Sequence, residues 1–169
     1  FICRRGEPTA IIGGTGSGKS TVASLILRFH EVTKGNILLN DRDIRSMTQN
    51  YLRKHLAYVQ QKAWLFSGTV ADNLRYGNKN ASREELMRAV EVAQAGEFVK
   101  SLPNGLNSYV AQGGTNFSGG QKQRLSIARA LVKKPELYIF DDSFSALDFK
   151  TDAALRKALS LIHISEPTR

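Results

Sequence analysis

Two features that would mark a secreted or membrane-spanning protein are missing from this sequence. Cys3 is the one cysteine among 169 residues, so no disulfide can form within the chain, and this usage suits a reducing compartment such as the cytosol. No stretch approaches the ~20 consecutive apolar residues that a membrane-spanning helix needs. We therefore expect any connection to a membrane to come from a partner or from chain outside this sequence.

Acidic residues are scarce relative to basic ones, which gives a formal net charge of +9. Such an excess is common in proteins that bind nucleic acid. Here, however, the basic residues are scattered along predicted helices instead of forming one stripe with interleaved aromatic residues. A solvated surface and an anionic ligand account for much of the charge, and an acidic membrane face or partner could use the rest. We expect no nucleic-acid partner.

What is present is the composition of a globular domain, with 41% hydrophobic and 23% charged residues. At this length the chain is one domain or a piece of one. Hydrophobic patterns, turn residues and capping residues predict helices that alternate with short strands. The strands are expected at 9–13, 37–39, 56–59 and 137–140, and the helices at 18–29, 48–55, 69–74, 82–95, 118–132 and 153–159, with a loop over 103–114.

The stretch GGTGSGKS has the pattern Gly-x-x-x-x-Gly-Lys-Ser of a phosphate-binding loop. It follows an apolar, strand-like run and opens a helical run, which is the setting that this loop requires. Its glycines let the backbone approach a ligand closely, and its amide groups point at an anion at the start of a helix. The nucleotide-binding residues predicted here are Gly13, Gly14, Thr15, Gly16, Ser17, Gly18, Lys19, Ser20 and Thr21.

Four side chains are expected to carry specific chemistry around this loop. Lys19 is expected to reach the β- and γ-phosphates of a nucleoside triphosphate, and the Ser20 hydroxyl is expected to hold Mg²⁺. The apolar strand 137–140 ends in Asp141 and Asp142. Because ligands of open α/β sheets lie beyond the carboxyl ends of the strands, Asp141 is predicted to face the Mg²⁺. Asp142 stands where a general base for an attacking water could sit.

A second anion-binding helix start is predicted at Ser118, Gly119, Gly120 and Gln121. By itself this pattern is weak, because Ser-Gly-Gly also occurs in ordinary loops and caps. A single nucleotide needs only one phosphate-binding loop. The second site therefore suggests a ligand that is shared between two subunits.

Together these segments resemble the nucleotide-binding domain of an ATP-binding cassette (ABC) transporter of the exporter type. GGTGSGKS resembles the Walker A motif, LYIFDD the Walker B motif and FSGGQKQR the ABC signature. Ser145–Asp148 resembles the D-loop, Val59–Gln61 the Q-loop, and Trp64–Gly77 the exporter version of the segment that follows it. The resemblance covers about residues 1–158.

The resemblance implies an α/β fold of the P-loop NTPase class, in which helices flank a RecA-like parallel sheet and an α-helical subdomain is inserted. The core would comprise residues 1–66 and 133–158, and the helical subdomain about residues 67–132. Residues 159–169 resemble instead the in-frame translation of a sequencing adapter, so His163 is given no functional role. The aromatic residue that stacks on adenine and the switch histidine are expected outside this sequence.

The resemblance also implies a function. In this family two such domains pair head to tail around two molecules of ATP with Mg²⁺, each site taking the signature motif from the other domain. Gln61 would contact the Mg²⁺ and act in catalysis with Lys19 and Asp142, while Asp148 would contribute to the nucleotide site. The pair would drive a transmembrane domain of the same full-length chain, at the cytoplasmic face of the cell membrane.

One position departs from the family pattern. Most such domains have Glu after the Walker B aspartate, whereas this chain has Asp142. Asp is one methylene shorter, and the positioning of water by a general base is sensitive to displacements of ~1 Å. We therefore predict that this site binds ATP but hydrolyses it weakly, as in the degenerate half of a heterodimeric exporter. The alternative is that Asp142 is a working base in a homodimer.

Two other functions compete with the exporter interpretation. One is an ABC-type ATPase that acts on nucleic acid or ribosomes, which the net charge favours. The compact interval between Ser20 and Ser118 argues against the long-armed chromosome ATPases, and the exporter-like segment Trp64–Gly77 argues against the ribosomal relatives. The other is a non-catalytic, ATP-gated interaction module, which Asp142 favours.

Overall fold

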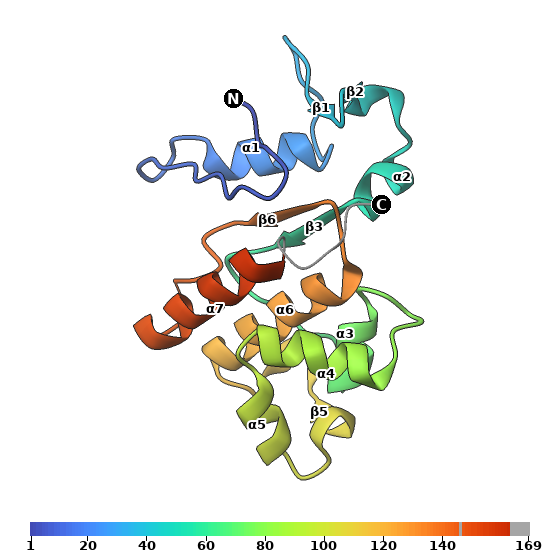
Figure 1. Cartoon of the computed structure of the whole chain (residues 1–169), viewed down its shortest axis with the longest axis vertical. Helices are drawn as coiled ribbons and strands as arrows, with labels where there is room; N and C mark the ends of the chain where they lie inside the picture. The colour runs from blue at the N-terminus through green and yellow to red at the C-terminus, as the bar shows by residue number, and fades with distance from the viewer. Residues whose placement is uncertain (146, 163–169) are drawn as a thin grey trace.

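The computed structural model of the chain describes residues 1–145 and 147–162, with side chains as far as Leu159 (Figure 1). Within these residues no helix is both long and apolar enough to cross a membrane. The helices are α1 Lys19–Ile26, α2 Gln49–Lys54, α3 Val70–Arg75, α4 Arg83–Val92, α5 Gly96–Ser101, α6 Gly119–Lys133 and α7 Phe149–Ile162. The strands are β1 Leu38–Leu39, β2 Arg42–Asp43, β3 Leu56–Val59, β4 Gly68–Thr69, β5 Tyr109–Val110 and β6 Leu137–Phe140, and short 3-10 helices cover Ile44–Ser46, Gly105–Asn107 and Gln112–Gly114.

The strands β3 and β6 lie side by side in parallel, with Tyr58 opposite Ile139. Because successive side chains of a strand point to opposite faces, Tyr58 and Ile139 face one way, toward a small core around Leu27 at the end of α1. Val59 and Phe140 face the other way, into the larger core that contains much of α6. Figure 1 shows the same division, with α1 on one side of the two strands and α6 and α7 on the other.

Helix α6 is the central element of the larger core. It packs against α3, α4 and β3, and Leu125, Ile127 and Ala128 on it are almost fully buried. It ends at Lys133 because Lys134 adopts a left-handed conformation with φ of 50°, and Pro135 has no N–H with which to continue the helix. Helices α3 and α4, which follow β3 in the sequence, are thus packed against α6, the helix that precedes β6.

In the described part of the chain, three helices begin with a capping box, in which the side chain before the helix and the side chain three residues later bond to each other's backbone N–H. The pairs are Thr69 with Asp72 at α3, Ser82 with Glu85 at α4 and Ser118 with Gln121 at α6. At α3 the Thr69 hydroxyl also donates to the Asp72 carboxylate at 2.7 Å, and this bond, followed by the one from the Thr69 backbone N–H, holds the pKa of Asp72 below its usual value. The capping box predicted at residues 82–85 is confirmed.

Most of the predicted elements are confirmed. Strands form at 56–59 and 137–140 with the predicted bounds, and the helix predicted over 48–55 forms as α2. The strand predicted at 37–39 is shortened to β1, and the predicted helix at 153–159 begins four residues earlier as α7. These segments have strong local patterns and also find a partner in the fold.

The strand predicted at 9–13 is wrong, since these residues form no regular element. Ile12 is 93% exposed and Ile11 is 46% exposed. Among the described residues, no backbone hydrogen bond joins this run to β6 or to another strand. An apolar run becomes a strand only when a neighbouring strand satisfies its N–H and C=O groups, and here the run has the composition but lacks the pairing.

The helix predicted over 82–95 is confirmed as α4, but it ends three residues earlier than predicted. It ends at Val92, because the backbone turns at Gln94 with φ of 56°, and a separate helix, α5, begins at Gly96. The turn brings Gly96 against the Glu91 carboxylate, where a Cβ would clash. Similarly, the predicted loop at 103–114 contains β5, which pairs with β4.

The close approach of Gly77 to α6 gives a test of the packing. A Cβ at Gly77 would clash with the carbonyl oxygen of Arg129 in α6, so Gly77→Ala should lower the free energy of unfolding by about 2 kcal/mol, which is roughly 4–8 °C in Tm. Thermal unfolding followed by circular dichroism measures this. Gly119→Ala is the matched control, because a Cβ at Gly119 meets open space, and equal stability of the two variants would contradict the packing.

Candidate functional site

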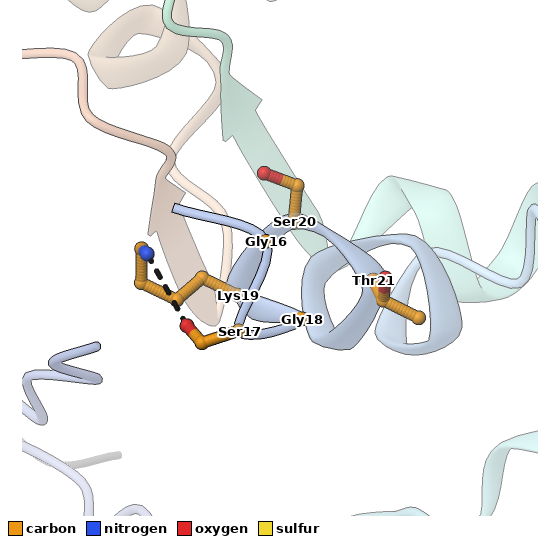
Figure 2. Close-up of a pocket in the computed structure, with 6 residues that line it drawn as sticks. All are labelled: Gly16, Ser17, Gly18, Lys19, Ser20 and Thr21. Atoms are coloured by element: carbon orange, nitrogen blue, oxygen red, sulfur yellow. Dashed lines mark hydrogen bonds between the residues drawn. The ribbon is translucent and has the colours of Figure 1, made fainter. Parts of the chain in front are cut away.

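The glycine-rich loop lies at the N-terminus of α1. Gly16 and Gly18 have φ of 80° and 91°, in the left-handed region that glycine adopts at little cost, and Gly18 directly precedes Lys19, the first residue of the helix. A hollow of about 190 Å³, lined by residues 16–21, opens at this point (Figure 2). The backbone N–H groups and the dipole at a helix start favour an anion in such a place.

The Lys19 side chain is held at the same loop. Its Nζ donates to the carbonyl oxygens of Gly13 at 2.6 Å and Gly14 at 2.7 Å. Figure 2 shows the side chain folded back beside Ser17, whose Oγ lies 3.4 Å from Nζ. The loop therefore positions its own cation, through acceptors that the oxygens of an anionic ligand could replace.

Ser20 and Asp141 are 121 residues apart in the sequence, yet the Ser20 hydroxyl donates to Asp141 Oδ1 at 3.2 Å. Ser20 lies in the first turn of α1, and Asp141 directly follows β6. The Tyr58 hydroxyl, from β3, donates to the other oxygen, Asp141 Oδ2, at 2.9 Å. Burial raises the pKa of Tyr58 to about 12, and the hydrogen bond to Asp141 acts in the same direction.

This cluster suits a magnesium ion in its chemistry. Mg²⁺ prefers hard oxygen ligands, and usually takes one or two from the protein together with water and phosphate. Ser20 and Asp141 supply a hydroxyl and a carboxylate next to the phosphate-binding loop, so the donor set fits. Mg²⁺ held there would partly neutralise the negative charge of a nucleotide's phosphates.

Gln61 and Asp142 form a second pair, at the ends of the same two strands. Gln61 Nε2 donates to Asp142 Oδ2 at 2.8 Å, and Asp142 has φ of 47°. A left-handed conformation is uncommon for a residue other than glycine and is often found at functional sites. Asp142, the predicted general base, is thus in contact with Gln61, the predicted Mg²⁺ contact and catalytic residue, and both are exposed.

The helix start at Ser118–Gln121 is at the surface. Ser118 and Gly119 are exposed, and the position of a Cβ on Gly119 faces open space. The side chains of Ser118 and Gln121 are engaged in their own capping box. Among the described residues no hydrogen bond joins this helix start to the glycine-rich loop. The structure therefore leaves the second predicted anion site open to solvent.

Asp148 lies outside both clusters. Its carboxylate accepts hydrogen bonds from the Thr151 backbone N–H at 2.9 Å and hydroxyl at 2.7 Å, which caps α7. These bonds hold the pKa of Asp148 below its usual value, with the Thr151 hydroxyl as the larger cause. The predicted D-loop also includes Ala146, which lies outside the described residues.

Two contacts of the site were not predicted from the sequence. One is the bond from Tyr58 to Asp141, which depends on the pairing of β3 with β6. The other is at Gln123, which is 1% exposed and donates from Nε2 to the Gln60 carbonyl oxygen at 3.2 Å. It links α6 to the residue before Gln61. A polar residue on an otherwise apolar helix face is the only sequence signal for such a link.

The arrangement defines a class of protein. A glycine-rich loop at a helix start, with the hydroxyl after its lysine facing a carboxylate at the end of a parallel strand, is the site of a P-loop nucleotide-binding protein. A family model described as "ABC transporter" matches residues 1–145 of the chain. The chain belongs to the ABC transporter family.

Several known proteins are similar to this chain. It is 50% identical over 162 residues to an uncharacterized ABC transporter ATP-binding protein of Mycobacterium bovis, which covers 94% of the chain and 28% of that protein. It is 43% identical over 154 residues to multidrug resistance protein pgp-1 of Caenorhabditis elegans, which covers 91% of the chain and 12% of that protein. The chain thus spans less than a third of the length of these relatives.

A solved structure of a bacterial Atm1-family ABC exporter with ATP bound is similar to the chain with a TM-score of 0.85 and 39% sequence identity. The likeness covers 89% of this chain and 26% of that one. It confirms the α/β fold of an ABC nucleotide-binding domain that the sequence predicted.

The capping boxes give a test of the α6 helix start. Ser118→Ala removes the acceptor for the Gln121 N–H, and should lower the free energy of unfolding by about 1 kcal/mol. Ser82→Ala is a matched change at α4 and should cost a similar amount. Chemical denaturation measures both, and an unchanged midpoint for Ser118→Ala would contradict the capping geometry at α6.

Proposed function

We propose that this chain is the ATP-binding motor domain of an ABC exporter, which binds ATP with Mg²⁺ and hydrolyses it. The observation that carries the proposal is the contact of Ser20 with Asp141, 3.2 Å apart at the start of α1 and the end of β6. It places the hydroxyl of the glycine-rich loop and the strand-end carboxylate where one ion could contact both. The family and the relatives described above support the same function.

Each residue of the site then has a role. The amide groups of residues 13–21 would bind the phosphates, together with Lys19, whose carbonyl partners would be exchanged for phosphate oxygens. Ser20 and Asp141 would hold Mg²⁺, with Gln61 contributing its side-chain oxygen. Asp142 would orient the attacking water, and the hydrogen bond to Gln61 Nε2 limits the positions that its carboxylate can adopt.

The exposed helix start at Ser118–Gln121 supports a head-to-tail pair of such domains. The side chains of Ser118 and Gln121 each accept a hydrogen bond from the other residue's backbone N–H, while Gly119 leaves open space beside the helix N-terminus. A phosphate bound at the glycine-rich loop of a second domain could approach there. Asp148, near the start of α7, would lie at the same interface. We infer that the partners are a second nucleotide-binding domain and a transmembrane domain, at the cytoplasmic face of a membrane.

ATP binding can be tested with Lys19. The Lys19→Ala variant should lose affinity for ATP by a factor on the order of 10- to 100-fold, because a charged donor to the phosphates is removed. Isothermal titration with ATP and Mg²⁺ measures this. Lys34→Ala removes an exposed lysine from the segment between α1 and β1 and serves as the control. Equal affinity of wild type and Lys19→Ala would rule out the proposed phosphate site.

We further propose that this site hydrolyses ATP weakly, as one half of a heterodimeric exporter whose other subunit has the more active site. Asp142 has a carboxylate on a shorter side chain than Glu, and that carboxylate is already bonded to Gln61 at 2.8 Å. A water held by it would lie farther from the γ-phosphate than a longer side chain would place it.

This proposal predicts a gain of function. Asp142→Glu should raise the rate of phosphate release by about tenfold over a slow wild type, because the carboxylate reaches farther toward the attacking water. Asp142→Asn, which keeps the size but removes the charge, should give no gain. ATP affinity is measured in parallel, and unchanged or lower turnover in Asp142→Glu with intact ATP binding would favour a homodimer in which Asp142 is the working base.

A further inference from the structure

The two oxygens of the Asp141 carboxylate have different partners. Oδ1 accepts a hydrogen bond from the Ser20 hydroxyl at 3.2 Å, and Oδ2 accepts one from the Tyr58 hydroxyl at 2.9 Å. A carboxylate bonded through one oxygen alone can rotate about its side-chain bonds. With both oxygens engaged, one by a hydroxyl of α1 and one by a hydroxyl of β3, its orientation is fixed.

Tyr58 is well placed to fix it because its own ring is held. It lies on β3 opposite Ile139 of β6, so Tyr58, Ile139 and the residue two further along, Asp141, share one face of the strand pair. The ring is half-buried and packs against the small core around Leu27. Its hydroxyl reaches the Asp141 carboxylate.

We propose that Tyr58 is a positioning residue for the Mg²⁺ of the nucleotide site. By holding Oδ2, it turns Oδ1 toward Ser20, so that the Ser20 hydroxyl and the Asp141 carboxylate face the same point before the nucleotide arrives. Tyr58 does not itself contact the ion. This inference rests on the proposed function, since it concerns the site at which that function places Mg-ATP.

Partners that orient a metal ligand usually contribute 10- to 100-fold to metal affinity. Removing the Tyr58 hydroxyl frees the Asp141 carboxylate to turn, and part of the Mg²⁺ binding energy is then spent on ordering it. The phosphate contacts of the glycine-rich loop do not pass through Tyr58. The loss should therefore appear in the Mg²⁺-dependent part of nucleotide affinity and not in the rest.

The experiment uses Tyr58→Phe in the whole chain, which keeps the ring in its core and removes the hydroxyl alone. A fluorescent ATP analogue is titrated once with Mg²⁺ and once with EDTA. We expect Tyr58→Phe to lose about tenfold in affinity with Mg²⁺, and to equal the wild type with EDTA. Tyr109→Phe is the matched control, because Tyr109 is 65% exposed on β5, and it should equal the wild type in both titrations.

A double-mutant cycle separates positioning from general destabilisation. If Tyr58 acts through Asp141, the change Tyr58→Phe should have no further effect on Mg²⁺-dependent affinity in the Asp141→Asn background. Equal losses with and without Mg²⁺, or a loss that adds to that of Asp141→Asn, would overturn the inference. So would an unchanged affinity of Tyr58→Phe. Failure of the wild type to bind the analogue under either condition would instead contradict the proposed function.

Discussion

The parallel pairing of β3 with β6 is the constraint on which the site depends. It brings together segments about 80 residues apart in sequence, with Tyr58 opposite Ile139 and Val59 opposite Phe140. Because both strands run the same way, their carboxyl ends meet at one edge. Each strand then delivers one partner of each contact, Tyr58 to Asp141 and Gln61 to Asp142. The pairing of these two short strands therefore fixes the positions of the residues proposed to hold the ion and to position the water.

The two faces of this strand pair carry the helices that form the two predicted anion-binding sites. One face carries α1, which follows the glycine-rich loop. The other carries α6, which begins at the exposed Ser118–Gln121 segment. Gln123 joins the second face to the site through its buried hydrogen bond to the Gln60 carbonyl. The helix that would close a neighbour's site is thus in direct contact with the backbone before Gln61.

Local patterns predicted much of the fold. The buried apolar runs at 56–59 and 137–140 became strands with those bounds, and the Ser82 and Ser118 caps marked true helix starts. The run at 9–13 has the same apolar character, yet it forms no strand, because no described neighbour pairs with it. The turn at Gln94 was missed since a left-handed conformation of a glutamine leaves no clear trace in the sequence.

The sequence by itself determined the chemistry available to this protein: a glycine loop ending in Lys19 and Ser20, an acidic strand end at Asp141 and Asp142, and a helix start at Ser118. Each of these patterns is formed by residues that are close together in the chain, so each can be recognised without knowing the fold. Only the tertiary structure decided which of them touch, which is why the role of the Tyr58 hydroxyl could not be read from the sequence. Strand register and helix packing select such contacts, and both depend on surfaces contributed by distant segments.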